Sequence, residues 1–329
     1  MCLSIDAEKD ACLLVWRKTL PLLSRFPEMH VRLQNDMVKC SMVPEITVGI
    51  VFHNAELYIA DVITSLQAQS FSNWEAVIVD DGSTDRSLEI VRAIADLRLR
   101  IFSDGLNKGV HVRRNEAVEL ARGRYFAIMD ADDIMHPDRL RIQVEKLRQC
   151  SDNTVIGSEA YLIDIDGAVL GKQKVPKRQK TGYAARHSFI NPTVAASTGW
   201  FRRNPWSTSD ICRYAQDAEL WCRVSGGSKF INLPQPLIFY RQTYSQRPLR
   251  YFWATCVMLS YICRAYKDRK FKLIFYVSRE CVKTLLFLSL YELGCTGLLP
   301  YARRSKLSET DLQDIRKTMQ RLSIPLRLQ

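Results

Sequence analysis

Two acidic clusters each follow a short apolar run, and this pairing constrains the fold of the chain more than any other feature. The first cluster is Asp80–Asp85, which follows Trp74–Val79, and the second is Asp130–Asp133, which follows Tyr125–Met129. Each run has the length and the apolar character of a buried strand. Strands that end in carboxylates place negative charge at the carboxyl edge of a sheet, where open α/β sheets bind their ligands. Crowded carboxylates repel one another, so we expect a divalent cation that bridges to a diphosphate there.

Apolar strand-like segments alternate with amphipathic helical ones through the first half of the chain. Strands are expected at Ile46–Val51, Glu75–Val79, Arg100–Phe102 and Tyr125–Met129. Helices are expected at Glu56–Gln69, over the segment that carries Leu88, Val91 and Ala95, at Gly109–Arg122, and after Pro137. This alternation predicts a largely parallel sheet with right-handed crossovers.

The pattern changes in the second half. The segments expected there are a hairpin formed by Thr154–Ile165 and Ala168–Lys172, a strand-like segment at Asn191–Arg203, and a helix at Gln216–Arg223. From about Gln246 the pattern predicts helices, and this part of the chain is rich in basic and aromatic residues. We therefore expect three regions: a helical N-terminal extension over residues 1–43, an α/β domain over 44–245, and a C-terminal helical region over 246–329.

The segment from about Pro44 to Arg241 resembles a family 2 glycosyltransferase. The resemblance rests on motifs in a fixed order: Ile46–Asn54, Asp80–Asp85, Asn107–Val110 with Arg114-Asn115, Asp130–Asp133, and Gln216–Trp221. One Asp-x-Asp arises often by chance, whereas the ordered set is specific. The resemblance implies the GT-A fold, an α/β architecture whose Rossmann-like, mostly parallel central sheet is flanked by helices, here with a C-terminal helical appendage.

The same resemblance implies roles for individual residues. The position of Asp81 binds the nucleobase, the Asp130-x-Asp132 pair holds the ribose and a divalent metal, and Asp217 is the catalytic base. The residues expected to bind the nucleotide-sugar are Phe52, Asn54, Asp81, Arg114, Asp130 and Ala131, and those expected to bind Mg²⁺ or Mn²⁺ are Asp130 and Asp132. Arg114 and Arg241 can contact the diphosphate, or can serve as structural ion-pair residues.

Two residues depart from the family pattern, and each acidic motif has a structural alternative. Gln216 stands where the family has an acid beside the base, and His53 stands where it has an aromatic residue before Asn54. The stretch Asp80–Asp85 also suits a turn with a helix N-cap. Alternation along the chain points Asp133 away from Asp130 and Asp132, so Asp133 is expected to be free to cap the next helix.

The expected reaction is transfer of a sugar from a nucleoside diphosphate sugar, with UDP-sugars as the commonest family donors, to an acceptor hydroxyl. One base without a second nucleophile implies a single displacement and inversion. We expect a role in polysaccharide, lipopolysaccharide or glycolipid assembly. The alternative is a catalytically inactive GT-A protein that binds a nucleotide or a partner. A nucleotidyltransferase is disfavoured, because the first turn, Phe52–Glu56, has no Gly, Arg or Lys to bind phosphates.

The net charge is +12 although the expected site is acidic, so the basic residues lie elsewhere. They gather in three runs: Lys172–Lys180, Arg264–Lys272 and Arg303–Arg321. Basic runs beside aromatic residues suit an anionic membrane surface or a glycan or lipid-linked acceptor, and they equally suit a solvated basic face. No nucleic-acid-binding motif occurs, so we expect no nucleic-acid partner.

Several features predict a cytoplasmic protein that lies on the inner face of the cytoplasmic membrane. The ten cysteines form no Cys-x-x-Cys pair, which suggests reduced and mostly buried thiols. Asp6, Glu8 and Asp10 stand where a signal peptide would be positively charged. Phe252–Cys263 is short and Cys281–Tyr301 carries charges, so both predict interfacial rather than spanning helices.

Overall fold

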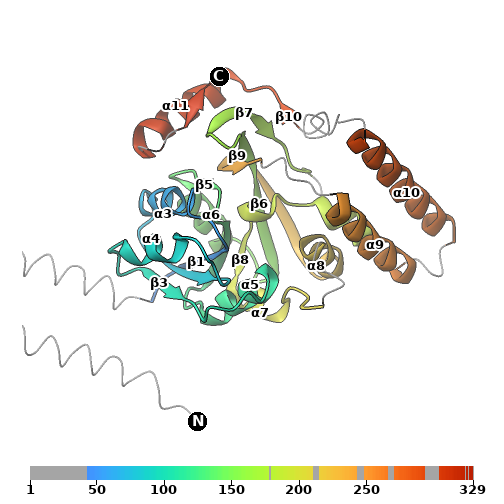
Figure 1. Cartoon of the computed structure of the whole chain (residues 1–329), viewed down its shortest axis with the longest axis horizontal. Helices are drawn as coiled ribbons and strands as arrows, with labels where there is room; N and C mark the ends of the chain where they lie inside the picture. Colours follow the sequence, from blue (N-terminus) through green and yellow to red (C-terminus); the bar gives the residue numbers. More distant parts are fainter. Residues whose placement is uncertain are drawn as a thin grey trace, which may run out of the picture. The chain divides into compact units, whose positions relative to one another are not determined.

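The computed structural model describes residues 43–177, 179–209, 215–242, 248–265, 270–292, 304–322, 324 and 326–328 (Figure 1). The predicted N-terminal helix lies outside these residues, as do parts of each basic run. Residues 44–329 form one compact unit, and the boundary expected between residues 245 and 246 falls inside it.

Four parallel strands place both acidic clusters at one edge of the sheet. They lie in the order β3-β2-β1-β4, with bounds Leu99–Phe102, Trp74–Asp80, Ile46–Phe52 and Tyr125–Asp130. Phe52 pairs with Asp80 on one side, and Val51 pairs with Asp130 on the other. The carboxyl ends of β2 and β4 therefore flank the end of β1, as the sequence predicts.

Two helical layers cover this sheet, because successive strand residues point to opposite faces. Ile78 packs on the face covered by α3 (Ile59–Gln67), α4 (Ser87–Ala93) and α6 (Arg139–Arg148). Val77 and Val79 pack on the other face, which is covered by α5 (Val110–Leu120), α7 (Thr198–Arg203) and α8 (Gln216–Val224). The helices on both faces thus fix the position of the edge at which the strands end.

The second half of the sheet is mixed rather than parallel. The expected hairpin is present as β6 (Thr154–Ile163) and β7 (Ala168–Gln173), and Gly167 adopts a positive φ of 83° in its turn. Strand β9 (Lys229–Arg241) runs parallel to β6 and also pairs with β5 (Ile134–Met135). Strand β9 thereby carries its last residues to the turn that follows β4.

The segment Asn191–Arg203 is mostly not a strand, which corrects the expectation from sequence. It forms the 3₁₀ turn η2 (Asn191–Thr193), the short strand β8 (Ala195–Ser197) and then α7. The hydroxyl of Ser197 accepts a hydrogen bond from the backbone N–H of Trp200 at 3.0 Å. A serine N-cap of this kind starts a helix and so ends the strand.

The C-terminal region contains the expected helices together with two short strands. Its elements are α9 (Pro248–Ala265), α10 (Lys270–Glu292), β10 (Arg304–Ser305), α11 (Glu309–Leu322) and β11 (Arg327–Leu328). Helix α10 packs against α9, while β10 and β11 both pair with β7. Residues 327–328 therefore belong to the main sheet. Among the described residues, no helix is long and apolar enough to cross a membrane.

The cysteines of the described residues are less buried than expected. Cys222 is buried, whereas Cys263 and Cys281 are exposed. Burial raises the pKa of the Cys222 thiol to about 12, which keeps it protonated and unreactive.

Candidate active site

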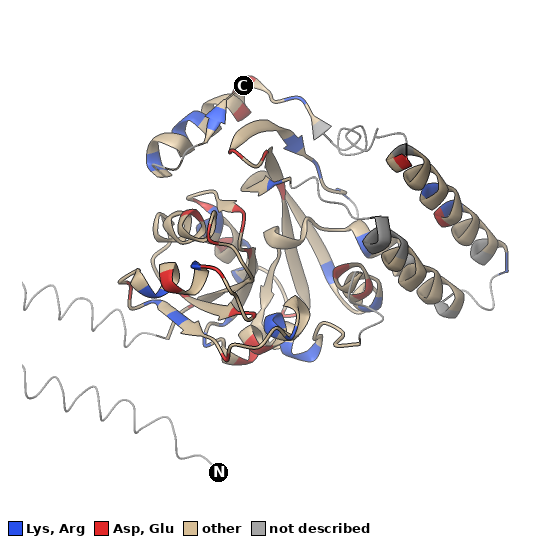
Figure 2. Ribbon diagram, in the orientation of Figure 1, with Lys and Arg blue, Asp and Glu red and all other residues tan. Residues whose placement is uncertain are grey.

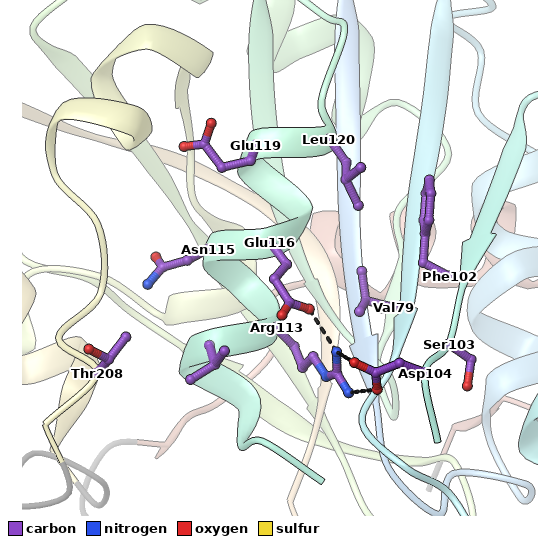
Figure 3. Close-up of a pocket in the computed structure, with 11 residues that line it drawn as sticks. Val79, Phe102, Ser103, Asp104, Arg113, Asn115, Glu116, Glu119, Leu120 and Thr208 are labelled. Carbon is purple, nitrogen blue, oxygen red and sulfur yellow. Dashed lines mark hydrogen bonds and ion pairs between the residues drawn. The ribbon is translucent and has the colours of Figure 1, made fainter. Parts of the chain in front are cut away.

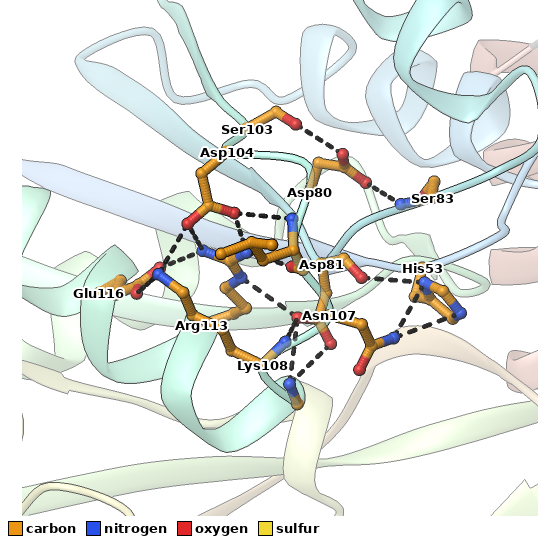
Figure 4. Close-up of polar contacts among 12 residues, drawn as sticks. His53, Asp80, Asp81, Ser83, Ser103, Asp104, Asn107, Lys108, Arg113 and Glu116 are labelled. Carbon is orange, nitrogen blue, oxygen red and sulfur yellow. Dashed lines mark hydrogen bonds and ion pairs between the residues drawn. The ribbon is translucent and has the colours of Figure 1, made fainter.

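The loop after β2 is shaped by Asp80, whose side chain is buried (Figure 4). One carboxylate oxygen accepts the backbone N–H of Ser83 at 2.9 Å, and the other accepts the hydroxyl of Ser103 at 2.7 Å. Asp80 therefore has a structural role, and the next residue, Asp81, is the one presented at the edge.

The carboxylate of Asp81 faces the N-terminus of α5 and is nearly saturated with donors. It accepts the backbone N–H groups of Lys108 at 2.7 Å and Gly109 at 3.0 Å, and Nε of Arg113 at 3.2 Å (Figure 4). Gly109 has a φ of 93°, which turns its N–H toward Asp81 without the strain that a side chain would add. Helix N-termini favour anions, so this position suits the carboxylate of Asp81, and the three donors fix its orientation.

Arg113 continues from Asp81 to the surface, where Glu116 and Asp104 bind its guanidinium. The hydrogen bond to Asp104 is the main reason that the pKa of Arg113 is raised. A cavity of about 630 Å³ lies against Arg113 and is lined mainly by Val79, Phe102 and α5 (Figure 3). None of the predicted site residues lines it, so the cavity is separate from the acidic edge.

The first turn of the domain is bonded to the loop after β2. His53 Nδ1 lies 3.0 Å from the backbone oxygen of Asp81, and Asn54 Oδ1 accepts the N–H of Thr84 at 2.8 Å. Asn54 has a φ of 53°, a left-handed conformation that asparagine tolerates well. The side chain of Phe52 is buried in the core, so only its backbone can face a ligand.

Arg114 joins the end of β4 to the start of α8. Its Nη2 donates to Asp130 Oδ1 at 2.8 Å, and its Nη1 donates to Asp217 Oδ1 at 3.0 Å. Burial acts to lower the pKa of Arg114, but attraction to Asp217 and Asp130 outweighs it and raises the pKa. One guanidinium thus binds two acids that lie 87 positions apart along the chain.

Helix α8 turns Asp217 toward this site and Glu219 away from it. Glu219 forms an ion pair with Arg223 on its own helix at 2.8 Å. Trp206, which precedes α8, donates its indole N–H to Asp217 Oδ1 at 2.9 Å. No local sequence pattern around Trp206 marks it as a site residue, so the sequence alone does not predict this contact.

The tip after β4 carries Asp132 and Asp133 in different surroundings. Burial, and then repulsion from Asp130, raises the pKa of Asp132 to about 6. Asp133 is fully buried and accepts the backbone N–H of Arg241 at 2.8 Å. Burial is also the first cause that raises the pKa of Asp133, and its Oδ2 has no hydrogen-bond partner among the described residues.

Two expectations about this tip are resolved by β9. Asp133 does not cap the next helix, because its carboxylate binds the end of β9 and α6 begins only after Asp138. Arg241 has a structural role: its guanidinium donates to the backbone oxygens of Asp132 at 2.8 Å and Ile165 at 2.8 Å. It therefore ties the acidic tip to the β6–β7 hairpin.

Tyr240 is a further residue of the site, and the sequence did not assign it there. Tyr240 of β9 lies among the acids, and burial followed by repulsion from Asp133 and Asp130 raises its pKa. The amide Nε2 of Gln216 lies 2.7 Å from His111 Nδ1, and both side chains are buried. The family acid at position 216 is thus replaced by a neutral partner for a buried histidine.

Comparison with known proteins agrees with this architecture. Residues 47–206 match the family described as glycosyl transferase family 2. The Escherichia coli UDP-Glc:alpha-D-GlcNAc-diphosphoundecaprenol beta-1,3-glucosyltransferase WfgD is 30% identical over 126 residues, which are 38% of this chain and 49% of WfgD.

Two solved structures resemble the chain at low sequence identity. S. aureus TarS 1-349 in complex with UDP-GlcNAc has a TM-score of 0.56 at 17% identity, covering 84% of this chain and 81% of that one. Mannosyltransferase PcManGT from Pyrobaculum calidifontis, in complex with GDP-Man and Mn²⁺, has a TM-score of 0.52 at 16% identity, covering 92% and 94%. The predicted GT-A fold is confirmed.

The family match and the relatives indicate a glycosyltransferase, and the solved structures show that its fold is of the GT-A type. The family match spans the strands and helices that build this edge. This match confirms the resemblance to family 2 glycosyltransferases that the sequence predicts, over residues 47–206.

We predict that Asp81→Asn lowers the free energy of unfolding by about 1–3 kcal/mol. The amide keeps one acceptor oxygen but turns an N–H₂ group toward the donors of Lys108, Gly109 and Arg113. Urea denaturation followed by circular dichroism measures the change. Asp104→Asn is the matched control, because Asp104 also binds Arg113 but its side chain is 39% exposed, so its loss should cost less. Wild-type stability of Asp81→Asn would contradict this bonding.

Proposed function

We propose that the chain is an inverting glycosyltransferase that moves a sugar from a nucleoside diphosphate sugar, with a UDP-sugar as the expected donor, to an acceptor hydroxyl. The main support is the position of Arg114, which binds Asp130 at 2.8 Å and Asp217 at 3.0 Å. The end of β4 and the carboxylate assigned as base lie on either side of this one side chain. A base this close to a donor held at β4 can reach a hydroxyl that attacks the donor sugar.

The donor is assigned to the edge formed by the ends of β1, β2 and β4. Asp81 is assigned to the nucleobase, since a carboxylate accepts a hydrogen bond from a uracil-type N–H. Arg114 is assigned to the diphosphate, because a guanidinium has five N–H donors and its bonds to Asp130 and Asp217 use two of them. Phe52, Asn54 and Ala131 frame this edge. The complexes of TarS with UDP-GlcNAc and of PcManGT with GDP-Man support a nucleotide-sugar donor.

A divalent cation, Mg²⁺ or Mn²⁺, is assigned to Asp130 and Asp132. Carboxylate oxygens suit hard cations. Burial, and then repulsion from Asp130, raises the pKa of Asp132, and a cation would relieve that repulsion. The described residues contain no group of three or more His, Cys, Asp or Glu that could complete a metal site, so diphosphate oxygens and water would complete the shell. When bound, the ion supplies charge compensation for the departing diphosphate. The Mn²⁺ bound to PcManGT supports this assignment.

The base is assigned to Asp217. The acceptor hydroxyl gives its proton to this carboxylate while its oxygen bonds to the anomeric carbon, and the bond from that carbon to the diphosphate breaks. This single displacement inverts the configuration. Glu219, the other acid of the motif, is occupied by Arg223 and lies on another side of α8.

The acceptor is assigned to a glycan or a lipid-linked sugar at the inner face of the cytoplasmic membrane, in the assembly of a polysaccharide or glycolipid. The lipid diphosphate in the name of WfgD supports such an acceptor. Helix α10 exposes apolar side chains at spacings of three and four residues: Phe271, Ile274, Phe275, Val282, Leu285 and Leu286. Figure 2 shows basic residues along the same helix. Lys270 and Lys283 lie on the same helix. This combination suits an interfacial helix at an anionic membrane.

We predict that Asp132→Asn abolishes the metal-dependent part of nucleotide binding. Loss of a residue that only supports a metal ligand costs about 10–100-fold in affinity, so loss of the ligand itself should cost at least as much. Calorimetry with UDP in the presence and absence of Mn²⁺ measures this. Asp166→Asn, on the exposed turn of the β6–β7 hairpin, is the control and should bind like the wild type. Unchanged affinity in a folded Asp132→Asn protein would exclude Asp132 as a ligand.

We predict that Asp217→Asn removes sugar transfer and leaves donor binding nearly intact. Asparagine keeps the shape of the side chain but cannot accept the proton, so kcat should fall by about 100-fold or more. A panel of nucleotide-sugars assayed for release of the nucleoside diphosphate identifies the donor and measures kcat. Glu219→Gln is the matched control. An inactive Glu219→Gln beside an active Asp217→Asn would reverse the assignment, and a wild type that is inactive with every donor would favour a nucleotide-binding scaffold.

We predict that the double variant Phe271→Glu, Phe275→Glu binds anionic vesicles several-fold less than the wild type. Both side chains are exposed, Phe271 by 92% and Phe275 by 62%, and the new charges repel anionic lipid. Flotation with phosphatidylglycerol vesicles at low and high salt measures the bound fraction. Leu97→Glu is the control, because Leu97 is 72% exposed on the sheet domain. Equal flotation of all three proteins would refute docking through α10.

A further inference from the structure

Both hydrogen bonds to the carboxylate of Asp217 go to the same oxygen. Oδ1 accepts Nη1 of Arg114 at 3.0 Å and the indole Nε1 of Trp206 at 2.9 Å. Within the described part of the chain, Oδ2 accepts no hydrogen bond. A carboxylate held in this way has a fixed rotation, with one oxygen bound to the protein and the other directed elsewhere.

Trp206 is itself held in place from two sides. The side chain of Asn115 donates to the backbone oxygen of Trp206 at 3.0 Å and accepts its backbone N–H at 3.0 Å. The indole ring is 1% exposed and stacks on Phe201, with ring centroids 5.5 Å apart. Asn115 follows Arg114 directly on α5, so two consecutive residues hold Asp217, one directly and one through Trp206.

The two donors to Asp217 are not equivalent. Arg114 divides its guanidinium between Asp217 and Asp130, and it is assigned to the diphosphate as well. The indole ring of Trp206 has one N–H group, which can only donate, and it donates to Asp217. When Arg114 bonds to a ligand, the indole N–H remains the fixed contact that keeps Oδ1 in place.

We propose that Trp206, anchored by Asn115, is a positioning residue that binds Oδ1 of Asp217 and leaves Oδ2 to take the proton of the acceptor. This proposal rests on the proposed role of Asp217 as base. The acceptor O–H bond breaks and its proton moves to Oδ2, while the oxygen electron pair forms the new bond to the anomeric carbon. The anomeric carbon–oxygen bond breaks, and its electron pair leaves with the nucleoside diphosphate. A base that is fixed before the acceptor arrives needs no reorientation in the transition state.

The variant Trp206→Phe removes the N–H and keeps an aromatic ring in the core. The matched control is Trp200→Phe, because Trp200 is equally buried and its indole N–H donates to the hydroxyl of Ser228 at 2.9 Å. We expect kcat of Trp206→Phe to fall about tenfold or more, because a hydrogen bond to a charged group is lost. The affinity for UDP with Mn²⁺ should not change in either variant, and kcat of Trp200→Phe should stay near the wild-type value. Equal kcat values for the two variants would overturn the proposal.

A second measurement tests the contact without any activity. In a protein labelled with ¹⁵N-tryptophan, the indole resonances of Trp206 and Trp200 are identified by their absence from the two Phe variants. Asp217→Asn should move the Trp206 resonance and leave that of Trp200 in place, and an unmoved Trp206 resonance would overturn the proposal. A moved resonance with unchanged kcat in Trp206→Phe would overturn the positioning role alone. A wild type that transfers no sugar would overturn this role together with that of Asp217.

Discussion

Helix α5 is the element on which the geometry of the whole site depends. Arg113 and the backbone N–H groups of the two residues just before α5 bind Asp81. Arg114 binds Asp130 and Asp217, and Asn115 binds Trp206. Consecutive helical residues advance by about 100°, so these three side chains point in three directions from nearly one level of the helix. Helix α5 thus fixes the distances between three parts of the site: the residue assigned to the nucleobase, the end of β4 assigned to the metal, and the residue assigned as base.

The parallel register of β1 with its two neighbours supplies the second constraint. Because Val51 lies opposite Asp130 and Phe52 lies opposite Asp80, the acids that follow β2 and β4 must emerge at the same level. No loop movement is needed to assemble them. Strand β1 ends at Phe52, so only the turn that follows it lies outside the core. Phe52 is therefore buried, while the residues after it lie at the edge of the sheet.

The sequence predicts the acidic edge well, because that edge depends on strand ends, and apolar runs mark these clearly. It predicts the roles of Arg241 and Asp133 less well. Both depend on β9 reaching the tip after β4, a pairing between segments about a hundred residues apart that no local pattern encodes. Trp206 was missed for a similar reason: its partner Asn115 lies 91 residues away. Helix α5 itself is predicted by the sequence, but its buried face includes the polar residues His111 and Arg113, whose burial the apolar pattern does not indicate.

Charge compensation differs among the crowded acids of this edge. Asp130 and Asp217 share Arg114, and Asp81 has Arg113 and a helix terminus, so each of these three has a permanent cationic or dipolar partner. Asp132 and Asp133 have no ion pair among the described residues, and burial raises the pKa of both. The protein thus gives Asp81, Asp130 and Asp217 ion-pair partners, and gives the carboxylate of Asp132 none among the described residues. An acid in this condition would be stabilised by a cation that arrives with the substrate, which supports the proposal of a nucleotide bound together with a divalent cation rather than a nucleotide alone.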